Sequence, residues 1–237
     1  MRRPAAALAP AIAVLLASAA AFAQSPPAPP GPYVIDIRAP MSGLPSGSAF
    51  HPVIPANALV PKRGFGFDVG GHVYVASLGI ARVGVGVDVL RARGTAVTPA
   101  PATAATTTTA PTTSSTSSTS ALSATDRIDV VMTMTTIAPQ VSFNFGAREG
   151  WSYLSAGYGA ATLRTTASGT LVGPLTASPT LVRDDGRAAA INYGGGARWF
   201  IKERIAVGFD LRFHRIAGVG TRPSTRLVAV SAGLSVR

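Results

Sequence analysis

Hydrophobic and polar residues alternate with a period of two over most of the chain. From Val207 to Phe213, large apolar residues occupy every second position, and glycine or charged residues lie between them. The same alternation runs through residues 65–75 and 81–89. Successive side chains of a strand point to opposite faces, so each segment predicts a β-strand with one apolar face and one polar or small face.

Eight such segments are predicted along the chain. They are residues 33–42, 64–76, 79–91, 129–146, 151–165, 188–201, 204–216 and 225–237. Short connections of two to four residues (Ser77-Leu78, 147–150, Lys202-Glu203) alternate with long ones (43–63, 92–128, 166–187, 217–225). This alternation is typical of a membrane barrel and has no counterpart in a Greek-key sandwich. The predicted fold is therefore all-β, an eight-stranded antiparallel up-and-down transmembrane β-barrel with short periplasmic turns and long extracellular loops.

The N-terminal segment has the three-part layout of a secretory signal peptide. Arg2 and Arg3 precede an uncharged, Ala- and Leu-rich stretch that ends in an A-x-A pattern at residues 21–23. The alternative is a membrane anchor, but Pro10 interrupts the stretch and a Pro-rich segment follows it. We expect a cleaved signal peptide at 1–23, a Pro-rich periplasmic leader at 24–32 and a barrel at 33–237.

Composition narrows the class of protein further. The 237 residues are 47% hydrophobic and only 13% charged, with a formal net charge of +11 and no cysteine. A disulfide scaffold and a cysteine-ligated metal site are excluded. Residues 95–125 contain no charge and consist mostly of Thr, Ser, Ala and Pro, so we expect a disordered surface loop. An O-glycosylated or adhesive loop is the sharper alternative.

The polar face of the predicted strands carries four of the ten acidic residues. The expected lumen network consists of Asp36, Arg38, Asp68, His72, Arg82, Asp88, Arg198, Asp210, Arg212 and His214. Four carboxylates would meet four guanidiniums inside a narrow barrel, where charges must pair. Glycines on the same face would leave space for these side chains. A polar interior is expected for a membrane barrel, with the apolar face toward lipid.

Aromatic residues gather near the short turns. We expect Tyr33, Phe143, Phe145, Trp151, Tyr153, Trp199 and Phe200 to form a girdle at the membrane interface, with ordinary core packing as the alternative. Arginines lie near the long loops, namely Arg91, Arg93, Arg127, Arg183, Arg187, Arg222 and Arg226. They predict contacts with phosphates of an anionic outer leaflet, so the expected partners are the lipid bilayer and lipopolysaccharide. No nucleic acid partner is expected, and the barrel is expected to be a monomer.

One hairpin carries a family resemblance. The glycine-rich strand Asn192–Ile201, its short charged turn and the following strand Arg204–Arg212 resemble the sixth and seventh strands of small outer-membrane β-barrels. This family is typified by the OmpA transmembrane domain and OmpX-type barrels. The resemblance implies eight antiparallel strands, periplasmic termini and long external loops, in a family that shares an architecture and no single activity. Such barrels usually end in an aromatic residue, whereas this chain ends in Val236-Arg237.

No catalytic constellation, cofactor motif or metal site is predicted. His72 and His214 could share the lumen with Asp68 and Asp210, but a satisfied polar interior explains them better. We therefore expect a structural or surface-interaction role in the bacterial outer membrane, without catalysis. Two alternatives stay open, a soluble periplasmic barrel that binds an apolar ligand and a narrow channel.

Overall fold

The computed structural model describes residues 31–52, 54–99, 127–147, 149–170 and 180–237. The predicted signal peptide and most of the Thr/Ser-rich segment lie outside the described residues. Within them, eight antiparallel strands close into one barrel in which sequential neighbours pair and β1 pairs with β8. The predicted fold class, an eight-stranded up-and-down β-barrel, is confirmed.

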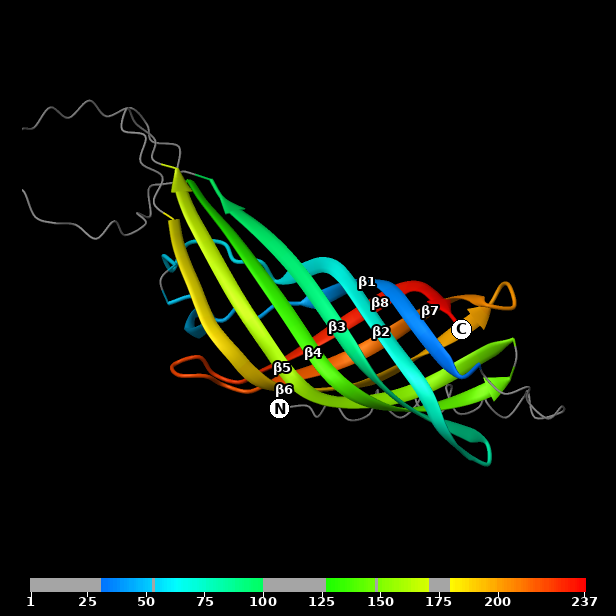
Figure 1. The fold of residues 1–237 in the computed structure, drawn as a ribbon. Coiled ribbons are helices and arrows are strands. Elements are labelled where there is room, and N and C mark those ends of the chain that lie inside the picture. The colour runs from blue at the N-terminus through cyan, green and yellow to red at the C-terminus, as the bar shows by residue number, and fades with distance from the viewer. Residues whose placement is uncertain (1–30, 53, 100–126, 148, 171–179) are drawn as a thin grey trace, which may run out of the picture.

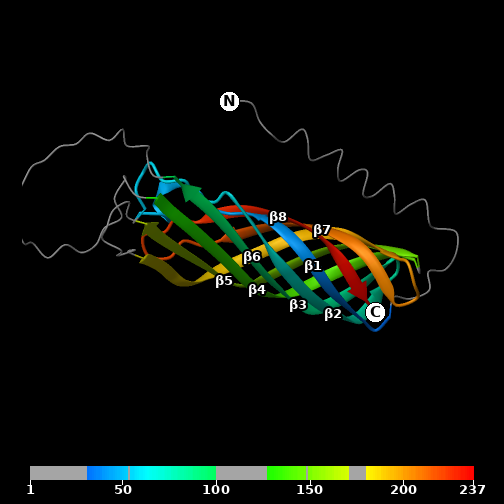
Figure 2. The same cartoon turned by 90° about the horizontal axis from the view of Figure 1, so that it is seen from above.

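The strands differ in length around the wall. Their bounds are β1 Tyr33–Gly43, β2 Arg63–Leu78, β3 Ala81–Thr98, β4 Arg127–Ala147, β5 Gly150–Thr170, β6 Thr180–Phe200, β7 Ile205–Ile216 and β8 Thr225–Val236. A short 3₁₀ helix, η2 (Ser48–Phe50), lies in the connection between β1 and β2. The turns β2–β3, β4–β5 and β6–β7 gather at one end of the barrel (Figure 1), and the C-terminus lies at that same end (Figure 2). No helix in the described part of the chain is long and apolar enough to cross a membrane.

Four strands extend farther toward the long-loop end than the sequence predicts. Strand β3 continues to Thr98, β4 begins at Arg127 instead of 129, β5 continues to Thr170 and β6 begins at Thr180 instead of 188. Residues 95–98 are thus strand and not disordered loop. The charged residues 183–185, just before Gly186, are typical of a loop in the sequence. This stretch forms a strand whose register shifts opposite β5, with Gly186 at a φ of 72° that favours glycine.

The first tight turn also lies two residues later than expected. Leu78 pairs with Ala81, so Gly79 and Ile80 form the connection and Ser77-Leu78 belongs to β2. Gly79 adopts a φ of 58°, as two-residue hairpin turns require. The sequence prediction placed the turn at the polar residue and overlooked the glycine beside it.

Candidate functional site: the barrel interior and its outward surfaces

An ion pair anchors the interior near the short turns. Arg198 Nε donates to Asp36 Oδ1 at 2.8 Å and Arg198 Nη2 donates to Asp36 Oδ2 at 2.7 Å. The Ser235 hydroxyl donates to Asp36 Oδ1 at 2.6 Å. The pair is bidentate and deeply buried, which is the strong form of a carboxylate–guanidinium contact.

Arg38 is the hub of the next layer. Its Nε lies 3.1 Å from Asp68 Oδ2, and its Nη2 donates to Asp88 Oδ1 at 3.2 Å. Its Nη1 donates to the Tyr153 hydroxyl at 2.7 Å, and that hydroxyl donates to Asp210 Oδ2 at 2.6 Å. Residues from five strands are therefore connected through one guanidinium, although they are far apart in the sequence.

A third guanidinium completes the interior network. Arg212 Nε and Nη2 donate to the two oxygens of Asp210 at 3.1 and 3.0 Å. Nine of the ten predicted lumen residues are buried. The exception is Arg82, which is half-buried near the short turns. The ion pairs described above join four carboxylates, Asp36, Asp68, Asp88 and Asp210, to three guanidiniums.

Glycines leave space for this network. A Cβ on Gly70 would lie 3.1 Å from Arg38 Nη2 and 3.2 Å from Asp88 Oδ1. A Cβ on Gly196 would lie 2.8 Å from the Tyr153 hydroxyl. Larger residues at these positions would push the charged side chains out of hydrogen-bonding geometry.

The two interior histidines do not form a metal centre. His72 and His214 are buried on β2 and β7, at 3% and 1% exposure. Among the described residues, no group of three or more His, Cys, Asp or Glu could hold a metal ion.

The predicted aromatic girdle is only partly an outward feature. Tyr33, Phe143 and Trp199 are exposed on the outer wall, and Phe145 is half-buried there. Trp151 and Tyr153 instead point inward, at 2% and 3% exposure. Residues opposite one another in a sheet share a face, and these two pair with the inward Arg198 and Asn144. Their assignment to the girdle was wrong.

The inward rings close the short-turn end of the barrel. Trp151 packs edge-to-face against Tyr74 with 6.0 Å between ring centroids, and against Phe200 at 4.8 Å. The guanidinium of Arg237 lies 4.0 Å from the Phe200 ring centroid and 5.3 Å from that of Trp151. The terminal residue thus covers the aromatic cluster by a cation–π contact. The position of these aromatic residues beside short turns does not predict the cluster, because its rings come from three separate strands.

The outer wall carries a continuous apolar belt. On β7 every outward residue from Ile205 to Phe213 is apolar, and on β8 the same holds from Val236 back to Val228. Strand geometry gives this stretch of β7 about 26 Å of length, or roughly 20 Å of height at a tilt near 40°. With side-chain ends included, the height approaches the about 25 Å apolar band of membrane barrels.

An arginine collar bounds the belt toward the long loops. We use this name for five exposed arginines that lie where the belt ends on their strands, namely Arg63, Arg91, Arg187, Arg215 and Arg226. Thr135 and Thr162 continue the boundary on β4 and β5, and the register joins Arg91, Thr135, Thr162 and Arg187 in one row. Beyond this boundary, most outward positions are polar, as at Thr133 and Arg164, although Val97, Val131 and Val182 also face outward.

Inside the wall, polarity changes at the same level. Beyond the collar the interior is filled by Leu90, Met132, Met134, Leu163, Ile216 and Leu227, with small alanines between them. A second apolar cluster, farther along, contains Ile54, Ile128, Val130 and Ala167. The expectation of a polar interior is therefore wrong for this half. Where the outer wall is polar, the interior can bury its apolar side chains as a soluble domain does.

The connection between β1 and β2 covers this apolar interior. Leu44 is 5% exposed within the first apolar cluster and Ile54 is 8% exposed within the second. The backbone N–H of Leu44 donates to the Lys62 carbonyl at 2.9 Å, and that of Leu59 donates to Thr98 Oγ1 at 2.6 Å. The sequence pattern alone predicts only a loop at residues 43–63. The apolar residues within it were the available signal that it packs inward.

Polar groups are also enclosed at this end of the barrel. His51 is 4% exposed, and its Nε2 lies 3.0 Å from the Pro45 carbonyl oxygen. Burial lowers the pKa of His51 below its ordinary value of about 6.5, and the positive charge of Arg183 adds to this. Arg183 Nε donates to Asp185 at 2.8 Å, and Arg222 Nη1 lies 3.8 Å from the same carboxylate. Arg183 and Arg222 thus bind Asp185 and are not outward lipid contacts, which corrects that expectation.

Solved structures with a similar fold are small barrels from bacterial outer membranes. Neisserial surface protein A is 14% identical, with 87% of this chain and 97% of that chain covered and a TM-score of 0.43. The attachment invasion locus protein Ail of Yersinia pestis is 13% identical over 86% and 97%, with a TM-score of 0.46. The outer membrane protease OmpT of Escherichia coli is 8% identical over 90% and 99%, with a TM-score of 0.41. No family model and no curated protein matches.

Proposed function

We propose that this protein is a small bacterial outer-membrane β-barrel with a structural or surface-interaction role and no catalytic activity. The observation that carries the proposal is the inversion of polarity at the arginine collar. Below the collar the wall is apolar outside and charged inside, and above it the wall is mostly polar outside and apolar inside. Only a barrel that passes from lipid into water needs both arrangements.

The inversion also gives an orientation. The short turns and the C-terminus would lie in the periplasm, and the long strands β3–β6 would carry their loops outside the cell. The collar would then lie at the headgroups of the outer leaflet. Guanidiniums bind phosphate in bidentate geometry, so lipopolysaccharide is the expected lipid partner at this level.

The filled interior argues against a transport role. The Asp36–Arg198 pair and the Arg38 hub occupy the lower interior, and Leu90, Met134 and Leu163 fill the upper one. Eight strands enclose an interior just wide enough for side chains. The same contacts argue against catalysis, because each of the four lumen carboxylates lies within salt-bridge distance of a guanidinium.

A soluble barrel with an apolar ligand is the second candidate. The apolar core above the collar favours it, since an apolar interior under a mostly polar outer wall is also the arrangement of a water-soluble barrel. The belt opposes it, because a soluble barrel would expose Phe67, Tyr158 and Leu234 to water at 49%, 66% and 52%. An apolar exposed surface of this extent needs a membrane or a partner.

Cysteine labelling tests the proposal directly, since the chain has no cysteine of its own. Single variants Val141→Cys and Thr133→Cys place a thiol outward on the same strand, below and above the collar. In vesicles, we expect a water-soluble maleimide to label only T133C and a lipid-soluble one to label V141C. Water-soluble labelling of both, together with recovery of a soluble monomer without detergent, would contradict a membrane barrel.

The transport question has its own measurement. In planar bilayers we expect no ohmic conductance from the inserted barrel. Conductance that responds to substitution of Arg38→Ala would instead establish a lumen pathway and favour the narrow channel.

A further inference from the structure

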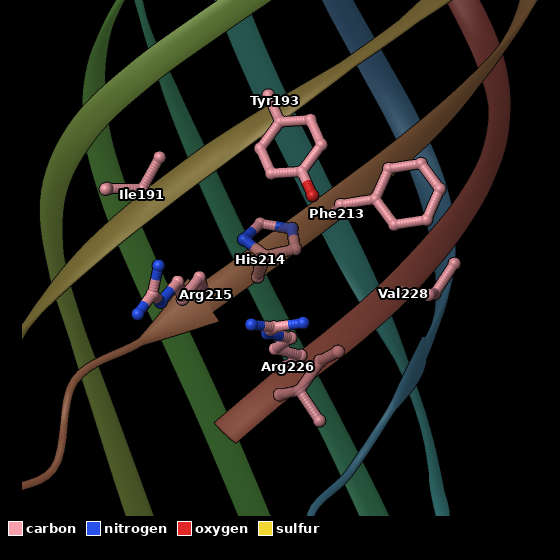
Figure 3. Close-up of a pocket in the computed structure, with 8 residues that line it drawn as sticks. Ile191, Tyr193, Phe213, His214, Arg215, Arg226 and Val228 are labelled. Atoms are coloured by element: carbon pink, nitrogen blue, oxygen red, sulfur yellow. The ribbon is translucent and has the colours of Figure 1, made fainter. Parts of the chain in front are cut away.

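A groove of about 330 Å³ lies on the outer wall where the belt meets the collar. Figure 3 shows it across β6, β7 and β8. Two neighbouring rows of outward side chains line it, Ile191–Arg215–Arg226 and Tyr193–Phe213–Val228. The upper row is basic and the lower row is apolar, so the groove is amphiphilic.

The basic row leaves two positive charges uncompensated. Arg215 and Arg226 are direct partners in the β7–β8 register, which sets their Cβ atoms about 4.5–5.5 Å apart. Like charges at such positions destabilise a sheet. No salt bridge to either arginine occurs within the described residues. In the described strand pairs, no other two arginines lie directly opposite, since Arg91 faces Thr135 and Arg187 faces Thr162.

The lower row provides an apolar floor. The rings of Tyr193 and Phe213 are stacked, with centroids 5.5 Å apart and an interplanar angle of 18°. Tyr193 is 52% exposed and Val228 is 43% exposed, and Leu211 continues the apolar surface down the belt. A small soluble anion would satisfy the arginines and leave this floor uncovered. A ligand that uses both rows has an anionic head and an apolar body.

We infer that the groove binds a membrane lipid with a phosphate-bearing headgroup. One phosphate lies between Arg215 and Arg226 and accepts hydrogen bonds from both guanidiniums. An acyl chain lies over Phe213 and Val228 toward the middle of the belt. This inference rests on the proposed function, because the lipid comes from the bilayer around the belt.

Native mass spectrometry of the full chain in maltoside micelles tests it, with the bis-phosphorylated glycolipid lipid A as the probe. Arg215→Gln/Arg226→Gln removes two charges at the groove, and Lys202→Gln/Arg204→Gln is the matched control, because it removes two exposed charges in the β6–β7 turn, away from the collar. Because charged hydrogen bonds are lost only at the groove, we expect about a tenfold loss of retained lipid for the first variant and about twofold or less for the control. Phe213→Ala should also reduce retention while keeping both charges.

Further arms separate the sources of the phosphate. A phosphate-free glycolipid of equal chain length should not be retained, and millimolar inorganic phosphate should not displace lipid A. Equal loss in both double variants, or retention of the phosphate-free lipid, would overturn the site. Heat-modifiable migration checks that each variant folds, and the single variants R215Q and R226Q replace the double one if it does not. Entry of the wild type into vesicles without lipid retention refutes this site alone, whereas failure to enter vesicles refutes the membrane barrel.

Discussion

The half of the barrel below the arginine collar and the half above it use the same strands in opposite ways. On β4, Val141 faces outward and Gln140 inward below the collar, whereas Thr133 faces outward and Met134 inward above it. The lower interior is held by buried ion pairs and the upper interior by aliphatic packing. The difference teaches that the surroundings of the wall, and not the strand itself, decide which face carries the apolar residues.

Charge pairing should distinguish the halves most strongly. Asp210→Ala leaves Arg212 and Arg38 with one carboxylate fewer in a buried site, so we expect the free energy of unfolding to fall by about 3–5 kcal/mol. Urea unfolding in vesicles measures it. The control Asp129→Ala breaks the exposed pair with Arg127 above the collar and should cost about 1 kcal/mol or less. A D210A cost as small as the control would mean that the lower interior is wet.

Aliphatic packing should matter in the upper interior and not on the lower outer wall. Leu163→Ala opens a cavity in the apolar cluster, where we expect a loss of about 2–5 kcal/mol. Leu234→Ala removes the same atoms from an outward position in the belt, where lipid tails are as apolar as leucine and can fill the space. The same unfolding measurement compares the two. Similar losses would show that Leu234 does not face lipid.

A new outward charge tests the level of the collar. Phe209→Arg places a guanidinium at the middle of the five apolar outward positions of β7 and should cost about 2–4 kcal/mol. Thr135→Arg places one at the collar itself, where about 0–1 kcal/mol is expected. If both variants unfold with the same free energy, the apolar belt does not lie in a bilayer.

The smallest effect concerns the connection that covers the upper interior. Burial and Arg183 lower the folded-state pKa of His51, so the unfolded segment binds protons more readily as the pH falls below about 6.5. Neutral His51 therefore contributes fully to the stability of this connection above about pH 6.5. The contribution is lost as the pH falls from 6.5 toward the lower pKa of the folded state. Proteolysis within residues 44–62 should be faster at pH 5 than at pH 7.5. His51→Gln should remove this pH dependence, and an unchanged ratio would exclude His51 as its source.

Much of the barrel follows from the sequence because alternation is a local property. Eight strands, their order and the short turns could be read from period-two segments and connection lengths. The lower interior was equally accessible, since Asp36, Asp68 and Asp210 lie on the polar face of clearly alternating strands. What could not be read was the length of β6, because its polar outward residues look like a loop.

The sequence by itself determined that each strand has two unlike faces and that the lower interior is charged. Only the tertiary structure decided that the faces exchange roles at the collar, that Trp151 and Tyr153 turn inward, and that Arg222 is buried. Alternation shows that the two faces differ, but it does not show which medium each one meets. That depends on the closed register, which fixes the level of every residue, and on the β1–β2 connection, which packs Leu44 and Ile54 into the upper interior.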